Sequence, residues 1–161
     1  MFSDITHLNE SHQLLHQLTQ QLRNCDDHDV STSYGRLLDW TEQVFGTEQR
    51  LMDKHAFPAT QCHLEQHARV LCAMHRAHTA VMRGDHALGR HVGASLLAGW
   101  FELHNATLDA AMLLWTSCRI SAQQHEVNHS TAWLVAAPSH LEPRSVPAPW
   151  STQERRSQPR I

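Results

Sequence analysis

Apolar residues recur every three or four positions in four successive segments of this chain, a spacing that predicts one buried face on each of four helices. The segments cover about residues 5–24, 34–56, 60–82 and 88–121. Short polar, Phe-Pro and Arg-Gly-Asp stretches separate them, and such short connections favour antiparallel neighbours. No segment shows the alternation that is typical of a β-strand. The sequence therefore predicts an all-α fold, an up-down antiparallel four-helix bundle.

The composition changes after Ser121. Residues 122–161 contain five of the six prolines and no glycine, show little periodicity and end in the basic stretch QERRSQPRI. This composition is typical of a segment that forms no packed core. We predict a bundle over residues 1–121 and a Pro-rich, disordered tail over residues 122–161. Trp133 and Trp150 could dock on the bundle or on a protein partner, although isolated apolar residues in a tail more often have no such role.

The bulk composition excludes several functional classes. A chain of 161 residues can bury a core without disulfides or a structural metal. Its 13 basic and 16 acidic residues, with no basic run before the tail, leave no electrostatic footprint for nucleic acid or a membrane surface. The N-terminus lacks a signal-peptide pattern, and no apolar run approaches about 20 residues. We expect a cytoplasmic protein whose four scattered cysteines are free thiols.

Histidine is over-represented, with 15 in the chain, and two histidines have the spacing of metal ligands. His63 and His67 are four residues apart, so their side chains lie one turn apart on one helix face and can bind one ion. Glu48 lies in the middle of the apolar stripe of the preceding helix. A carboxylate there is unfavourable unless it is paired or binds a metal, and no basic residue lies on the inward stripes.

The first and last helices add further metal-binding side chains to the same layer. Imidazoles and carboxylates without a thiolate favour iron, manganese or zinc over calcium or magnesium. The set exceeds what one tetrahedral zinc needs, and bundle cores are where dimetal carboxylate sites are built. The predicted ligands are His12, Glu48, His63, His67, His104 and Asp109.

The spacing of His104 and Asp109 does not fit a regular helix. Five residues leave the two side chains about 140° out of line. Both can face one cavity if the helix contains a π-bulge, which is frequent at functional sites, or if a dimetal centre spans the gap.

Four sequence blocks, in order over about residues 5–118, resemble those of the hemerythrin family, closest to its bacterial single-domain forms. LNESHQLL is similar to the block that ends in the first ligand histidine, and VFGTEQRLM resembles HFxxEExLM. HLEQH matches the HxxxH block, and WFELHNATLD resembles WLxxHIxxxD. Two positions depart from the family pattern. Val44 stands where the family has a ligand histidine, and Asn9 replaces a common acid.

The resemblance implies a centre of two carboxylate-bridged non-haem iron ions, with manganese or zinc as alternatives. His63, His67 and His104 would hold one iron, His12 and the missing histidine the other, and Glu48 and Asp109 would bridge them. The defect at residue 44 thus falls on the iron to which the family binds O2. Three outcomes are open: this iron keeps extra water, His16 replaces the missing ligand, or a different or single metal is bound.

The function implied is binding of O2 or a related small ligand, such as NO or peroxide, for sensing, storage or transport. One alternative is a di-iron enzyme, a peroxidase, oxidase or ferroxidase, because the substitution at Val44 leaves open coordination. The other is a metal-depleted bundle that acts as an interaction module. The sequence does not decide whether the protein is an enzyme.

Overall fold

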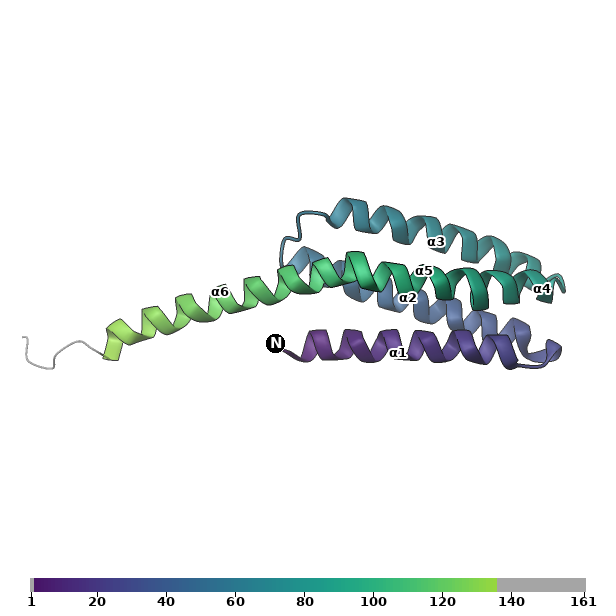
Figure 1. Ribbon diagram of the computed structural model, residues 1–161, viewed down its shortest axis with the longest axis horizontal. Coiled ribbons are helices and arrows are strands. Elements are labelled where there is room, and N and C mark those ends of the chain that lie inside the picture. The colour runs from purple at the N-terminus through teal and green to yellow at the C-terminus, as the bar shows by residue number, and fades with distance from the viewer. Residues whose placement is uncertain (1, 136–161) are drawn as a thin grey trace, which may run out of the picture. The chain divides into compact units, whose positions relative to one another are not determined.

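The structure, a computed structural model, describes the backbone of residues 2–135 and the side chains of residues 6–126. Four long helical stretches run antiparallel, up and down, as Figure 1 shows, so the predicted all-α four-helix bundle is confirmed. The first three stretches are α1 (Phe2–Asn24), α2 (Val30–Lys54) and α3 (Thr60–Val81), with a short 3-10 turn, η1 (Asp27–Asp29), before α2. The predicted corner at Phe57 and Pro58 separates α2 from α3.

The fourth stretch is a continuous run of helix that twice widens into a π-helix. It comprises α4 (His86–Gly89), the π-helix η2 (Arg90–Leu96), α5 (Leu97–His104), the π-helix η3 (Asn105–Asp109) and α6 (Ala110–Val135). At Gly93 a Cβ atom would lie 2.5 Å from Leu22 Cδ2, so the glycine allows this helix to approach α1 closely.

The second π-helix changes which residues of the last helix turn inward. The three- and four-residue spacing of the last segment predicts that Ala111 and Trp115 face the core. Both are exposed, while Met112 and Thr116 are fully buried. The extra residue in the wide turn shifts the helical phase by one position. The inward assignment after Asp109 was therefore wrong by one residue.

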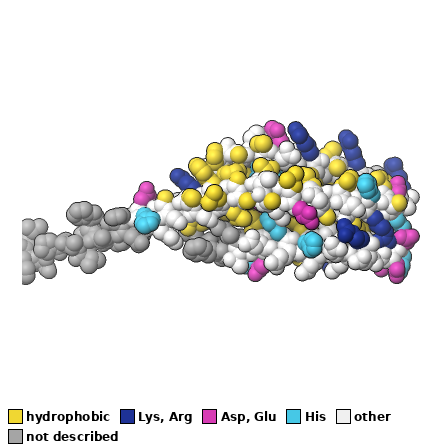
Figure 2. All heavy atoms as spheres, in the orientation of Figure 1, with side chains coloured by type: hydrophobic (Ala, Val, Ile, Leu, Met, Phe, Trp, Pro, Cys, Tyr) yellow, Lys and Arg dark blue, Asp and Glu magenta, His cyan; other side chains and the backbone are white. Residues whose placement is uncertain are grey.

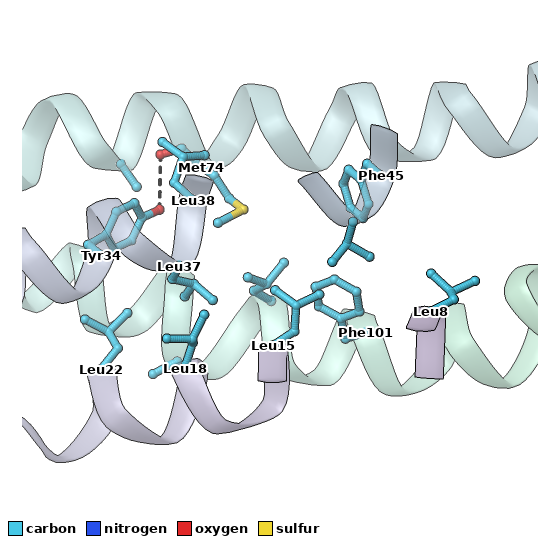
Figure 3. Packing of buried hydrophobic residues seen from close by; sticks show 14 of the residues in the cluster. Leu8, Leu15, Leu18, Leu22, Tyr34, Leu37, Leu38, Phe45, Met74 and Phe101 are labelled. Atoms are coloured by element: carbon cyan, nitrogen blue, oxygen red, sulfur yellow. Dashed lines mark hydrogen bonds between the residues drawn. The ribbon is translucent and has the colours of Figure 1, made fainter. Parts of the chain in front are cut away.

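The apolar spacing of the second segment predicts an inward stripe on α2, and its members are buried: Leu37, Thr41, Val44, Phe45, Glu48, Leu51 and Met52. His55, directly after α2, is only 4% exposed, and its backbone carbonyl accepts a hydrogen bond from Trp115 Nε1 at 3.0 Å. Figure 3 shows how the core around Phe45, Leu37 and Tyr34 packs, and how the Tyr34 hydroxyl donates to the Met74 carbonyl at 3.1 Å.

Arg90, in the fourth helical stretch, donates hydrogen bonds to the C-terminal end of α1. Its guanidinium donates to the carbonyls of Leu22 at 2.8 Å and Cys25 at 2.7 Å, and it pairs with Asp27 at 2.9 Å. In return, Arg23 on α1 donates to the Ala94 carbonyl in η2. The last carbonyls of a helix have no partner within the helix, and here a distant side chain supplies one.

α6 continues beyond the end predicted for the last helix, so residues 122–135 are helical rather than irregular. The compact unit that contains the bundle extends to Gln124, and the domain boundary after residue 121 stays a prediction. Trp150 and most of the predicted tail lie outside the described residues. Within the described part of the chain, no helix is both long and apolar enough to cross a membrane.

Candidate metal centre

The six predicted ligands lie together in one layer of the bundle. α1 contributes His12, α2 contributes Glu48, and α3 contributes two histidines. The fourth stretch contributes His104, directly before η3, and Asp109, the last residue of η3. Five of the six are buried, and the His12 side chain is 12% exposed. The residues form two overlapping groups whose ligand atoms all lie within 4.8 Å of one another: Glu48, His63, His67 and His104, and His12, Glu48 and Asp109.

Three imidazoles point their Nε2 atoms at one another. His104 Nε2 lies 3.0 Å from His63 Nε2 and 3.1 Å from His67 Nε2. One proton can join only one pair of these nitrogens, so their other lone pairs face each other without compensation. An ion about 2.1 Å from each nitrogen would see such pairs at about 90°, the angle between neighbouring ligands of an octahedron. The donor atoms thus fit a six-coordinate metal better than a tetrahedral one.

Two carboxylates lie between the imidazoles of the two groups. His12 Nε2 is 2.8 Å from Glu48 Oε1, and His67 Nε2 is 3.1 Å from Glu48 Oε2. Asp109 Oδ1 lies 3.2 Å from both His63 Nε2 and His104 Nε2. Despite these short contacts, Glu48 Oε2 and both Asp109 oxygens are buried without a well-oriented hydrogen bond. Such oxygens need a partner, and a cation between the groups would provide one.

The histidines of the cluster favour the ionised form of both carboxyl groups, which suits cation binding. Burial alone would raise the pKa of Glu48, but contacts with His12, His63 and His67 outweigh it and lower this pKa. The pKa of Asp109 is also lowered, because contacts with His104 and His63 outweigh burial. Both carboxyl groups are therefore ionised at neutral pH.

Two histidines of the cluster, His63 and His67, have pKa shifts in opposite directions. Burial by itself would lower the pKa of His63, but the nearby Asp109 and Glu48 have the larger combined effect and raise it to about 9. For His67 burial prevails over Glu48 and lowers the pKa. Without a metal, His63 thus carries a proton at neutral pH, and a bound cation would displace it.

Aromatic rings fix the orientation of two of the imidazoles. Phe45 stacks on His67, with ring centroids 3.7 Å apart and planes 3° from parallel. Trp100 stacks on His104 at 4.2 Å. The Nδ1 atom of His67 has no hydrogen-bond partner among the described residues, although metal-binding histidines usually donate from their second nitrogen. Stacking therefore provides the orientation that a hydrogen bond usually gives.

Sequence analysis missed these two stacked rings. Phe45 and Trp100 were taken only as parts of the resemblance and of the core. The available signal was an aromatic residue three positions before Glu48 and another four before His104.

Val44 and His16 are the two residues on which the predicted coordination of the second ion depends. Val44 is 2% exposed and belongs to the hydrophobic core. His16 is exposed and lines, with His12 and Asn105, a cavity of about 60 Å³ between α1 and the fourth stretch. The buried Oδ1 atom of Asn105 has no hydrogen-bond partner among the described residues. Small polar molecules can thus approach the His12 side of the cluster.

Comparison with known proteins agrees with this geometry. The chain is 26% identical over 123 residues to a bacteriohemerythrin from Ralstonia nicotianae, and the match covers 73% of this chain and 89% of that protein. The chain matches no protein-family model. No solved structure matches it either.

The chain is thus a distant relative of the hemerythrin family, as the four sequence blocks indicated, and the predicted resemblance is confirmed.

Proposed function

We propose that this bundle holds two non-haem iron ions and uses them to bind O2 or a related small ligand, NO or peroxide, for sensing, storage or transport. The observation that carries the proposal is the convergence of three imidazole Nε2 atoms on two buried carboxylates, three of whose oxygens lack a well-oriented hydrogen bond. Similarity to a bacteriohemerythrin supports iron rather than manganese or zinc. Bound iron would supply an open coordination position and an electron for the ligand.

The chain's own residues divide the work. His63, His67 and His104 would hold one ion, and His12 would hold the other. Glu48 and Asp109, ionised because their pKa values are lowered, would lie between the two ions and offset their charge. The two ring stacks keep His67 and His104 aimed at the centre and exclude water from that side.

The space beside His12 admits a small ligand. The inner cavity there measures about 60 Å³, room for a few water-sized molecules because one needs about 10–15 Å³. A wider, more open hollow of about 410 Å³ shares His12, His16 and Asn105 with it, so O2, NO and peroxide can reach His12 from solvent. Cytoplasmic location stays part of the proposal.

An enzyme is the second candidate, and a specific observation favours it. The group of His12, Glu48 and Asp109 offers three ligands, and His12 borders a cavity that reaches solvent. An ion there would keep exchangeable water, which suits peroxidase, oxidase or ferroxidase turnover. Many turnovers with peroxide and a reductant would favour the enzyme, and one stoichiometric spectral change would favour binding.

The first test is elemental analysis of anaerobically purified protein, with absorption spectra before and after admission of air. About two irons per chain and a new visible band are expected. Near-zero metal, or a single zinc, would instead favour the interaction module.

A variant pair makes the test specific to the missing ligand. Val44→His should raise the iron content or retention at the His12 side and strengthen the O2-dependent band. Gln43→His adds a histidine to the neighbouring exposed position of α2 and should change neither. Equal behaviour of the two variants would mean that residue 44 does not face the metal centre.

A further inference from the structure

A second cavity lies between α3 and the fourth helical stretch, apart from the His12 side of the cluster. It encloses about 340 Å³ and opens to solvent. Its walls are almost entirely apolar: Gln66, Arg69, Val70, Ala73 and Met74 on α3, and Val92, Leu96, Leu97 and Trp100 opposite them. In Figure 2 hydrophobic side chains gather on the visible face of the bundle.

The cavity has the size and composition of a site for a small organic molecule. Pockets for such ligands measure about 300–1,000 Å³ and combine apolar walls with few polar groups. The small side chain of Ala73 leaves space on the α3 side of the cavity, and Leu96 is 55% exposed at the rim. An exposed leucine beside an apolar hollow leaves surface that an occupant would remove from water.

The charge at the rim selects among occupants. Arg69 is the single charged residue that lines the cavity, and it is exposed and forms no ion pair with another described residue. A guanidinium in this position favours a carboxylate, sulfonate or phosphate. A docked helix presents several turns to its groove, whereas the α3 residues that line this cavity span only Gln66 to Met74.

Trp100 connects the cavity with the cluster. Its indole lines the cavity and also stacks on His104, with centroids 4.2 Å apart. Flat aromatic ligands pack well against such a ring. A molecule in the cavity would therefore lie one indole ring away from a metal-binding imidazole.

We propose that this cavity binds a planar aromatic molecule with one anionic group, the ring against Trp100, Leu96 and Val92 and the anion at Arg69. The proposal goes beyond the function inferred above and does not depend on metal binding. It assigns the cavity neither to O2 nor to a second protein chain.

The test uses the fluorescent probe anilinonaphthalene sulfonate, an aromatic anion of suitable size, with the full chain as purified. Fluorescence titration and calorimetry should give one site per folded chain. Ala73→Trp fills the cavity and should abolish this binding. Ala68→Trp places the same side chain on an exposed position of α3 outside the cavity and should leave it intact.

Charge reversal tests the anionic group. Arg69→Glu should weaken binding at least about threefold at low salt, while Arg76→Glu, seven residues further along the same helix and outside the lining, should not. Circular dichroism and metal content of every variant separate loss of fold or of metal from loss of probe binding. Equal binding by the two tryptophan variants would overturn the proposal. So would failure of the full chain to bind the probe.

Discussion

Tyr34 is the only tyrosine of the chain, so tyrosine absorbance reports on this one position in the core. Its side chain is fully buried, and burial raises its pKa from 10.0 to about 12. The neutral phenol is thus favoured in the folded state. The stability that this provides is present below pH 10 and is lost as the pH rises towards 12.

We therefore predict that tyrosinate absorbance rises with a midpoint near pH 12 in the folded protein and near pH 10 in urea. Unfolding experiments between these values should show stability falling with pH. A midpoint near 10 without denaturant would mean that the Tyr34 hydroxyl is open to water.

Two glycines of the fourth stretch should respond in opposite ways to alanine. At Gly93 an added Cβ lies 2.5 Å from Leu22 and 3.1 Å from Tyr34, whereas at Gly99 nothing lies within 4 Å. We expect Gly93→Ala to destabilise the protein by about 1–3 kcal/mol and Gly99→Ala to stabilise it by up to about 1 kcal/mol. Urea unfolding measures both, and destabilisation of equal size would contradict the close approach at Gly93.

Among single residues, the sequence predicted those with a chemical reason to be buried. Glu48 on an apolar stripe and the four-residue spacing of His63 and His67 led to the cluster directly. The contact of Trp115 with the His55 carbonyl could not be predicted, because the two residues lie 60 positions apart in sequence. Arg90 was missed because its partners lie more than 60 residues away in sequence.

Among helices, bounds were predictable wherever a residue interrupts the backbone pattern. Pro58 and Gly84, the latter at φ +96°, mark the ends of the second and third segments. The π-helix at Asn105–Asp109 was one of two explanations for the spacing of His104 and Asp109, and the structure has it. Its effect on the residues that follow could not be read from local periodicity, because a wide turn leaves no composition of its own.

The extra residue in η3 leads to a prediction at this scale. Deletion of exposed Ala106 should convert the wide turn into α-helix and leave the flanking residues in phase. Deletion of exposed Ala111, beyond it, should rotate Met112 and Thr116 by about 100° away from the core. The first variant should largely keep its melting temperature and its metal content, and the second should lose both. Unfolding of both would mean that η3 is not a local insertion.

For the whole molecule, the cluster links stability to pH and metal. The pKa of His63 is about 9 in the metal-free fold, above the ordinary histidine value of 6.5. Stability gained from its proton is therefore complete below pH 6.5 and disappears as the pH rises through 9. His67, whose pKa is lowered, releases its unfolded-state proton around pH 6.5 and so opposes the change only at the lower edge of this window.

We predict that metal-free protein loses stability between pH 6.5 and 9, while its affinity for added metal rises over the same range as His63 deprotonates. Metal at about 100 times its dissociation constant should stabilise the fold by about 2.7 kcal/mol. Melting temperatures with and without chelator measure both effects. A chelator-independent melting temperature would favour the interaction module.

The clamp made by Arg90 has a consequence for the order in which this chain can fold during synthesis. The carbonyls of Leu22 and Cys25 are bound by a side chain that leaves the ribosome 65 or more residues later. Until then the end of the first helix has only water for its last acceptors. Nascent chains stopped before residue 90 should show rapid amide exchange in that turn, and the helix made first should be the one completed last.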